Sequence, residues 1–537
     1  AHMGFSASEI DRVRRFWGAP HMAAREGLKA VQMFDAVAAG AIRAMWVMGT
    51  NPAASLPRAD HVRRALGTLD LLVVSENMLS NDTVNSGAHI LLPAAAWGEK
   101  DGTVTNSERR ITRQRPFLDL PGEVKPDWWI IAEVARRLGF AEAFDWPDVA
   151  TIFREHAALS GFENNGSRDF DISGLARITN ADYDGLVPVQ WPVRSTSDRG
   201  DKRFFAEGGF YSADRRARLV AIEPPALKVV TDAERPFLLN TGRVRDQWHT
   251  MTRTGKSPTL GRHIPEPFVA VGPADAAALG LSAGDIARIE SHHGAARLRV
   301  VIDEGQASGE VFAPIHWTAE TAADGRIGAV VQAATDPFSG QPEMKATTVA
   351  LSKVEVESEG FLLCRGEVAS LAGVLWTRVA TEGGTGLLFA ALAPLDGAAI
   401  IRGIAGSDDV ISEVGDPSRG LYRAAAFQDG RLTAVFFSGP GAREAWATVT
   451  RLFACPTLDP ADRRALLAGR SAEGIADQGP TVCACFAVGL TAVRCAISEG
   501  ASDVDAVGRA TKAGTNCGSC RSEIRKLIAA VRRLEPA

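Results

Sequence analysis

The sequence has 537 residues, 46% of them hydrophobic, which is more than a single core accommodates, so we expect three or four domains. Its formal net charge of −5 argues against a protein that binds nucleic acid or an anionic membrane surface. The most apolar stretch, 386–401, is shorter than a bilayer span and contains Pro394 and Asp396, so it predicts buried core and not a transmembrane helix.

The first region, 1–158, alternates between helical and strand-like patterns. A helix that ends at Gly40 precedes a strand at 46–48, and a helix from Ala59 precedes a strand at 69–74. This order predicts a parallel α/β layer, whose strands are followed by polar residues at 50–52 and 75–77. Nucleotides bind at that edge of open α/β sheets.

The rest of the chain divides by composition into four further parts. Residues 159–234 have weak periodicity and predict a connecting segment, whereas 235–354 contain short β-branched strands between turns, which predict a β-barrel. Residues 355–475 predict a small α/β domain, and 480–537 predict a small helical domain with cysteines in its loops. The fold class expected is therefore a multidomain α/β chain.

Four of the seven cysteines form two close pairs, Cys483 with Cys485 and Cys517 with Cys520. This is the spacing of metal ligands and not of a scattered disulfide framework, so it favours a reducing compartment and a cytoplasmic protein. The spacing alone leaves open whether the thiolates hold structural zinc or an iron–sulfur cluster.

The residues around these cysteines resemble a known domain. Val482-Cys-Ala-Cys-Phe486 and Lys512-Ala-Gly-Thr-Asn-Cys-Gly-Ser-Cys520 are similar to the [2Fe–2S] domain of the bacterioferritin-associated ferredoxin type. The resemblance implies that these four cysteines bind a [2Fe–2S] cluster and not zinc.

A second resemblance lies in the first region. The run from Trp97 through Gly98-Glu-Lys-Asp-Gly-Thr103 to Asn106-Ser-Glu-Arg109 resembles the signature of molybdopterin oxidoreductases of the dimethyl-sulfoxide-reductase superfamily. Further stretches that resemble this family, at 49–52, 75–76, 81–83 and 92–93, occur in the same order as in the family. The contacts that it implies with a molybdopterin guanine dinucleotide are Asn51, Ser75, Glu76, Asp82, Thr83, Gly98, Glu99, Gly102, Thr103 and Asn106.

The predicted barrel resembles the dinucleotide-binding barrel of the same superfamily at 240–243, 246–250 and 252–254, and 336–345 resembles a cofactor-contacting tail. The implied contacts are Thr241, Gly242, Arg243, Trp248, His249, Thr250, Gln341 and Lys345. Individually, Trp248 is also compatible with a core position and His249 with a structural histidine. The segment 326–329 lacks the asparagine that relatives commonly carry there.

The order of barrel, small α/β segment and [2Fe–2S] domain resembles assimilatory nitrate reductases. It implies reduction of nitrate to nitrite at molybdenum bis(molybdopterin guanine dinucleotide), with electrons from a ferredoxin, a flavodoxin or an NADH-dependent flavoprotein reductase. It implies neither a nucleic-acid nor a membrane partner. Family members carry a [4Fe–4S] cluster and the molybdenum-ligating cysteine upstream of the residues matched here, so we expect a C-terminal part that is inactive alone and assign no catalytic residue.

Two alternatives stay open at this point. A cytoplasmic formate dehydrogenase, or another bis-pterin oxidoreductase, would use the same dinucleotide-binding residues. A non-catalytic iron–sulfur module for electron transfer or docking would retain the cysteines with a decayed pterin site.

Overall fold

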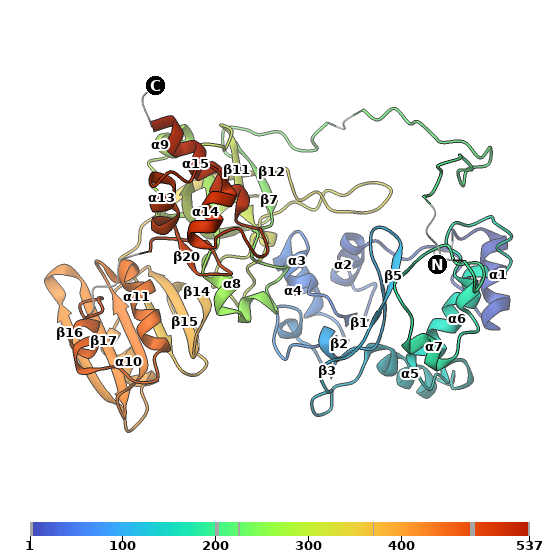
Figure 1. The fold of residues 1–537 in the computed structure, drawn as a ribbon, viewed down its shortest axis with the longest axis horizontal. Coiled ribbons are helices and arrows are strands. Elements are labelled where there is room, and N and C mark those ends of the chain that lie inside the picture. Colours follow the sequence, from blue (N-terminus) through green and yellow to red (C-terminus); the bar gives the residue numbers. More distant parts are fainter. Residues whose placement is uncertain (1–3, 199–202, 224–225, 369, 473–477, 535–537) are drawn as a thin grey trace.

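The protein is described from a computed structural model, which covers residues 4–198, 203–223, 226–368, 370–472 and 478–534. Figure 1 shows the N-terminal α/β region on one side of the molecule, with the barrel, a six-stranded sheet and the C-terminal helices on the other side. Over these ranges, no helix combines the length and the apolar character that crossing a bilayer requires.

The α/β layer is a parallel sheet, as predicted. Strands β1 (Ala44–Met48), β2 (Leu71–Glu76) and β3 (Ile90–Pro93) pair in that order. Helices α2 (Ala30–Ala38), α3 (Pro52–Ser55) and α4 (Ala59–Leu66) contribute Phe34, Ala53 and Leu66 to its core. The carboxyl ends of β1 and β2 therefore meet at one edge of the sheet.

A second small core extends the first region beyond its expected end. The elements that contribute to it are β5 (Arg110–Gln114), α6 (Val149–Gly161), α7 (Asn180–Asp184) and β6 (Val189–Gln190). The same part of the chain also contains α1 (Ala7–Trp17), β4 (Gly102–Thr105) and α5 (Asp127–Arg137). Phe153 of α6 packs with Ile172 and Tyr183. The boundary expected between residues 158 and 159 thus falls inside α6, because packed structure continues to Val193.

Beyond this core, the described residues 203–223 and 226–236 run across the top of the molecule in Figure 1 without helices or strands. Leu219 and Ile222 among them are exposed.

The predicted β-barrel is confirmed. Strands β7 (Phe237–Gly242), β8 (Phe268–Val271), β9 (Ile286–Glu290), β10 (Ala295–Ile302), β11 (Glu310–Pro314) and β12 (Thr347–Val354) close in the order β10-β8-β11-β7-β12-β9. Short helices α8 (Pro258–Gly261) and α9 (Pro273–Ala278) lie between strands. Closure depends on β12, which pairs with both β7 and β9 around a core that includes Leu239, Ile289 and Val311.

The next unit, here called the sheet domain, is a six-stranded antiparallel sheet between helices. Its strands are β13 (Ser358–Cys364), β14 (Val374–Thr381), β15 (Gly384–Ala391), β16 (Val410–Asp416), β17 (Leu421–Gln428) and β18 (Arg431–Ser438). One face packs with Ile401 of α10 (Gly397–Ile404), and the other packs with α11 (Ala442–Ala454) and α12 (Pro460–Leu466). The apolar stretch 386–401 lies in β15 and α10, and Leu387 and Ile401 at its two ends are fully buried.

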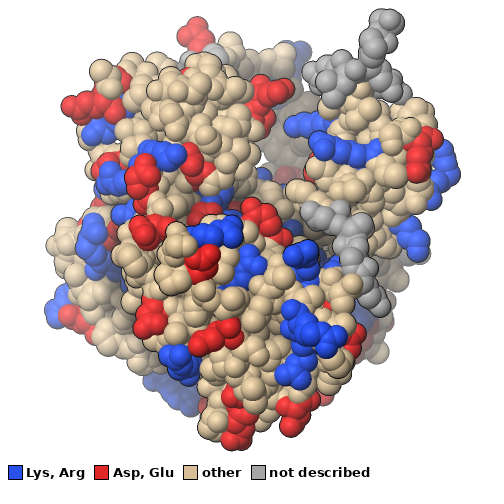
Figure 2. All heavy atoms as spheres, turned by 90° about the vertical axis from the view of Figure 1, so that its left-hand side faces the viewer, with Lys and Arg blue, Asp and Glu red and all other residues tan. Residues whose placement is uncertain are grey.

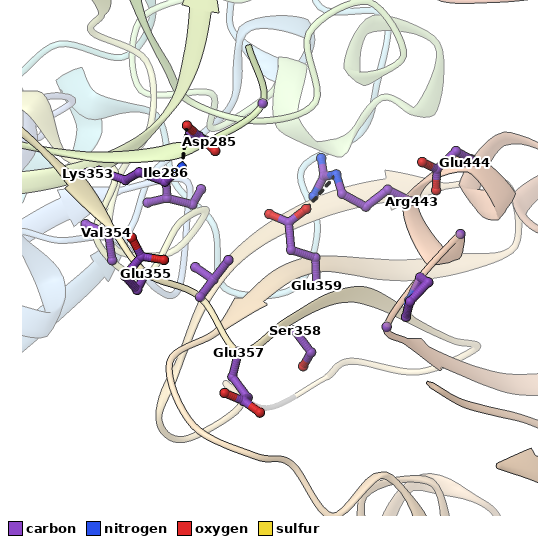
Figure 3. A pocket seen from close by; sticks show the side chains of 15 residues that line it. Asp285, Ile286, Lys353, Val354, Glu355, Glu357, Ser358, Glu359, Arg443 and Glu444 are labelled. Atoms are coloured by element: carbon purple, nitrogen blue, oxygen red, sulfur yellow. Dashed lines mark ion pairs between the residues drawn. The ribbon is translucent and has the colours of Figure 1, made fainter. Parts of the chain in front are cut away.

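Charged side chains fill the junction between the barrel and the sheet domain. A cavity of about 450 Å³ lies at this junction. Figure 3 shows the side chains that line it, among which Lys353 pairs with Asp285 (3.0 Å) and Arg443 approaches Glu359 (3.8 Å). Beside it, Glu266, whose side chain is 13% exposed, accepts hydrogen bonds from Arg299 and Arg443. The pair of Arg443 with Glu266 joins the sheet domain to the barrel, whereas Lys353 with Asp285 lies within the barrel and Arg443 with Glu359 within the sheet domain.

The C-terminal unit, here called the cysteine domain, spans 478–534. It contains β19 (Thr481–Cys483), β20 (Val488–Gly489), α13 (Leu490–Ser498), α14 (Val504–Thr511) and α15 (Arg521–Leu534), around a core with Val482, Val507 and Ile524. Figure 1 places it beside the barrel. Figure 2 views the molecule from the left-hand side of Figure 1 and shows Lys and Arg side chains interspersed with Asp and Glu over that face.

Candidate cofactor sites

The α/β layer and the barrel enclose a polar cavity at the ends of β1 and β2. This strand-end cavity has a volume of about 380 Å³ and is also lined by the barrel loop 248–253. Six residues predicted as cofactor contacts line it: Asn51, Ser75, Glu76, Trp248, His249 and Thr250. Residues far apart in the sequence thus meet at one site, and their hydroxyl, amide, carboxylate and imidazole groups suit a polar nucleotide.

Asn51 has a free hydrogen-bonding group at this cavity. Its Oδ1 accepts hydrogen bonds from the backbone N–H (3.1 Å) and hydroxyl (2.8 Å) of the buried Thr83. Its Nδ2 is buried and has no hydrogen-bond partner among the described residues. Thr83 therefore orients Asn51, and the amide N–H groups are left to donate to a ligand.

Acidic and basic groups stand on the sheet side of the cavity. Burial is the main reason why the pKa of Glu76 is raised, and its carboxylate accepts a hydrogen bond from the backbone of Asn77 (2.8 Å). Lys100 pairs with Asp127 at 2.6 Å, and both residues line the cavity. Neither residue was predicted to lie at the site. Lys100 could have been, because it belongs to the signature run and a cation there can pair with a phosphate.

On the barrel side, a buried histidine holds the loop that reaches the cavity. His316 is fully buried, and its Nε2 accepts from the backbone N–H of Val244 (2.9 Å) while its Nδ1 lies 2.8 Å from the carbonyl of His249. Burial lowers the pKa of His316, so the ring is neutral and Nδ1 donates to that carbonyl. His249 itself adopts a left-handed backbone conformation (φ 43°).

Trp248 is exposed at the cavity and does not lie in the core. The guanidinium of Arg243 lies over its ring, 5.3 Å from the centroid. Arg243 is not among the residues that line the strand-end cavity; it faces a crevice between the barrel and the cysteine domain.

The remaining signature residues lie within their own turn and hairpin. A Cβ at Gly98 would come 2.7 Å from the ring of Phe117, and Glu99 accepts from the backbone N–H of Ala96 (2.7 Å). Gly102 and Thr103 lie on β4, and Asn106 accepts from two backbone N–H groups of the next turn. The structure gives these five residues local roles, and their contact with a cofactor stays a prediction.

Four further predicted contacts hold the barrel's own strands and turns. Thr241 donates to the carbonyl of Met344 (2.7 Å), Lys345 donates to the carbonyl of Thr241, and a Cβ at Gly242 would meet Phe312 at 2.7 Å. Gln341 lies on an exposed turn, where its N–H donates to Ser339 Oγ (3.1 Å). None of the four lines the strand-end cavity.

Asp82 and Arg326 join the barrel to the α/β layer. The buried carboxylate of Asp82 accepts from the backbone N–H of Ala319 (3.0 Å) and lies 3.5 Å from Arg326, which also pairs with Asp60. Gly328 is so close to α3 that a Cβ there would come 2.8 Å from the carbonyl of Ala54. The segment 326–329 thus makes a contact between the barrel and the α/β layer.

The four predicted cysteine ligands come together in two pairs. Sγ of Cys485 lies 3.2 Å from Sγ of Cys517, and these two residues are exposed. Cys483 and Cys520 are buried and in contact with each other; burial, together with Cys483, raises the pKa of Cys520 to about 11. Gly514 (φ 81°) and Gly518 (φ 75°) allow the tight turn that carries Cys517 and Cys520.

This pairing fits a two-iron cluster, in which each iron takes two thiolates. In the described part of the chain, no three His, Cys, Asp or Glu side chains are arranged around a single metal position.

Comparison with known protein families gives three matches along the chain. Residues 6–137 match the family "Molybdopterin oxidoreductase", residues 237–348 match "Molydopterin dinucleotide binding domain", and residues 481–530 match "BFD-like [2Fe-2S] binding domain". Three separate parts of the chain are thus similar to a molybdopterin oxidoreductase, to a molybdopterin-dinucleotide-binding domain and to a [2Fe–2S] domain of the BFD type. These matches agree with the strand-end cavity and with the paired cysteines.

Among individual proteins, the chain is 41% identical to a nitrate reductase of Klebsiella oxytoca over 99% of its own length and 60% of the relative. It is 39% identical to a nitrate reductase of Shewanella frigidimarina over 70% of this chain and 42% of that protein. A subunit of F420-dependent formate dehydrogenase from Methanocaldococcus jannaschii is 31% identical over 58% of this chain and 43% of that protein. The chain thus spans about 60% or less of the length of these relatives.

Proposed function

We propose that this chain is part of an assimilatory nitrate reductase, which reduces nitrate to nitrite at molybdenum bis(molybdopterin guanine dinucleotide). The observation that carries the proposal is the 41% identity with the Klebsiella oxytoca nitrate reductase, which extends over 99% of the chain and so includes the cysteine domain. The similarity to formate dehydrogenase covers only 58% of the chain. The domain order favours nitrate over formate as the substrate.

The residues of the strand-end cavity would bind and orient the dinucleotide. Glu76 would accept the N–H donors that guanine presents, Asn51 Nδ2 would donate to an oxygen, and Lys100 would face a phosphate. When bound, the molybdenum cofactor supplies the site at which the oxygen of nitrate is removed and two electrons are delivered. The loop held by His316 would close the barrel side of the cavity and exclude water.

The cysteine domain would relay electrons one at a time to that centre. We include in the proposal an external donor, either a ferredoxin, a flavodoxin or an NADH-dependent flavoprotein reductase, and a [4Fe–4S] cluster in the upstream part that the relatives contain. A cytoplasmic location accompanies it, because the closely spaced thiols need a reducing compartment.

The test uses the natural protein that contains this chain, purified without oxygen. We expect nitrite to form from nitrate with a reduced viologen dye, and guanine nucleotide, molybdenum, iron and sulfide to be present in the protein. Formate oxidation without nitrite formation would move the assignment to the formate dehydrogenases. Iron and sulfide without guanine nucleotide would leave an iron–sulfur carrier.

A matched pair of variants tests the cluster ligands. Cys517→Ser removes one thiolate of the exposed pair, whereas Cys495→Ser changes a cysteine of α13 that lies beside Glu499 (3.2 Å). The [2Fe–2S] signal in electron paramagnetic resonance should disappear in the first variant and persist in the second. Equal signals in both would exclude Cys517 as a ligand.

A further inference from the structure

The cysteine domain meets the barrel through a small group of charged side chains, here called the docking cluster: Arg245, Asp246, His263 and Glu523. Arg245 makes the central contacts. Its Nη1 lies 2.7 Å from Glu523 on α15, its Nη2 donates to the carbonyl of Val482 on β19, and its Nε lies 3.0 Å from Asp246. One barrel side chain thus contacts two elements of the cysteine domain.

His263 completes the docking cluster from the barrel side. Its Nδ1 lies 2.9 Å from Asp246 and its Nε2 lies 3.4 Å from Glu523. The side chains of Arg245 and Asp246 are 17% and 9% exposed, so water screens their contacts less than it screens surface ion pairs. Cations and carboxylates alternate around the group, and each charge has a partner of opposite sign.

The position of the docking cluster relates it to both cofactor sites. Val482 directly precedes Cys483, and Glu523 lies on the first turn of α15 after Cys520, so Arg245 contacts a sequence neighbour of the buried cysteine in each cysteine turn. The same barrel segment continues from Arg245 to Trp248 and Thr250, which line the strand-end cavity. A single segment, 243–250, therefore faces the cysteine domain at one end and the cavity at the other.

We propose that Arg245 is a positioning residue that docks the cysteine domain on the barrel and places a positive charge beside its cluster. Hydrogen bonds to Glu523 and Val482 fix the cluster-bearing turns relative to segment 243–250. A positive charge at this position favours the reduced cluster, which carries one more negative charge. The inference rests on the [2Fe–2S] cluster and is independent of which substrate the enzyme reduces.

The first test is amide hydrogen exchange in the cluster-loaded chain. Arg245→Ala should raise exchange in α15 and around Val482 by roughly tenfold or more, because charged hydrogen bonds across the interface are lost. Arg245→Lys should raise it less, since a lysine keeps the charge but not the fork of donors. Arg288→Ala is the control, because Arg288 pairs within β9 with Glu290 and should leave exchange in the cysteine domain unchanged.

The second test is a redox titration of the cluster followed by electron paramagnetic resonance. The midpoint potential should fall in Arg245→Ala and stay close to the original value in Arg245→Lys and Arg288→Ala. The proposal would be overturned if Arg245→Ala had the same amide hydrogen exchange and the same cluster midpoint potential as the unchanged protein. If Arg245→Ala does not fold, Glu523→Gln tests the same contact from the cysteine domain. Raised hydrogen exchange at 243–250 in this variant would support the docking role of Arg245, and unchanged exchange would refute it.

Discussion

Two buried histidines of the barrel have opposite electrostatic environments. His316 sits between backbone groups, and its burial lowers its pKa. Burial alone would also lower the pKa of His263, but the nearby carboxylates of Asp246 (2.9 Å) and Glu523 (3.4 Å) outweigh burial and raise it. The pKa of one ring is therefore lowered by its surroundings and that of the other is raised.

Replacing His316 should loosen the loop that reaches the strand-end cavity. His316→Ala leaves the buried Val244 N–H and His249 carbonyl without their hydrogen-bond partner and also opens a cavity. We expect these two effects to lower the free energy of unfolding by roughly 2–4 kcal/mol. Denaturant unfolding of the barrel should show this loss. His292→Ala is the control, because His292 is an exposed barrel histidine; equal losses in both variants would contradict a specific role of His316.

The two histidines should give stability contributions of opposite sign with pH. The contribution of His316 is present above its unfolded pKa of about 6.5 and is lost as pH falls through its lowered folded value. That of His263 is present below about 6.5 and is lost as pH rises through its raised folded value. Thermal unfolding of His263→Gln against pH should differ most from the original protein on the acid side, and a difference confined to alkaline pH would refute this assignment.

At the residue level, the structure brings six of the residues predicted as cofactor contacts together at the strand-end cavity, and the others lie elsewhere. Asn51, Glu76 and His249 gather at the cavity because they end strands or follow them. Gly98 and Asn106 belong to the same resemblance but bond within their own turn and hairpin, since a motif does not say where each side chain points. His316 is remote in sequence from the loop that it supports, so only the fold reveals its role.

At the level of elements, close packing of short segments sets the shape of the cavity. η6 (Ile327–Ala329) approaches α3 at Gly328, where no side chain fits between the barrel and the α/β layer. The parallel layer and the barrel strands were predictable because their apolar residues follow a clear period. The continuation of the first region through α6 was not, because the buried face of that helix consists largely of Ala150, Ala157 and Ser160.

A methyl group at Gly328 should separate the barrel from the α/β layer. Gly328→Ala places Cβ 2.8 Å from the Ala54 carbonyl and 3.0 Å from the Leu56 carbonyl, so we expect a loss of about 1–3 kcal/mol and weaker dinucleotide retention. Thermal unfolding and nucleotide analysis measure the two effects. Gly403→Ala on α10 meets nothing within 4 Å and should instead stabilise its helix slightly; unchanged stability in Gly328→Ala would refute the tight contact.

At the level of the whole molecule, the paired cysteines and the strand-end cavity lie apart, and segment 243–250 of the barrel contacts the cysteine domain at one end and lines the cavity at the other. The core of the cysteine domain is small and includes Cys483 and Cys520 themselves. Its stability should therefore depend on the bound cluster far more than that of the barrel does.

Removing iron should show this difference directly. After chelation under reducing conditions, we expect hydrogen exchange to rise sharply across 478–534 while the barrel core around Leu239 and Ile289 stays protected. Reconstitution with iron and sulfide should restore protection. Equal loss of protection in both domains would show that they unfold as one unit.

The closure of the barrel by β12 also bears on how the chain folds during synthesis. Phe237–Gly242 cannot complete its pairing until Thr347–Val354 has left the ribosome more than a hundred residues later. In contrast, the cysteine domain is made of contacts that are local in sequence and is synthesised after the barrel. The barrel surface that carries Arg245 can therefore be complete before the domain that docks on it exists, so the exposed cysteine turns meet a barrel that has already folded.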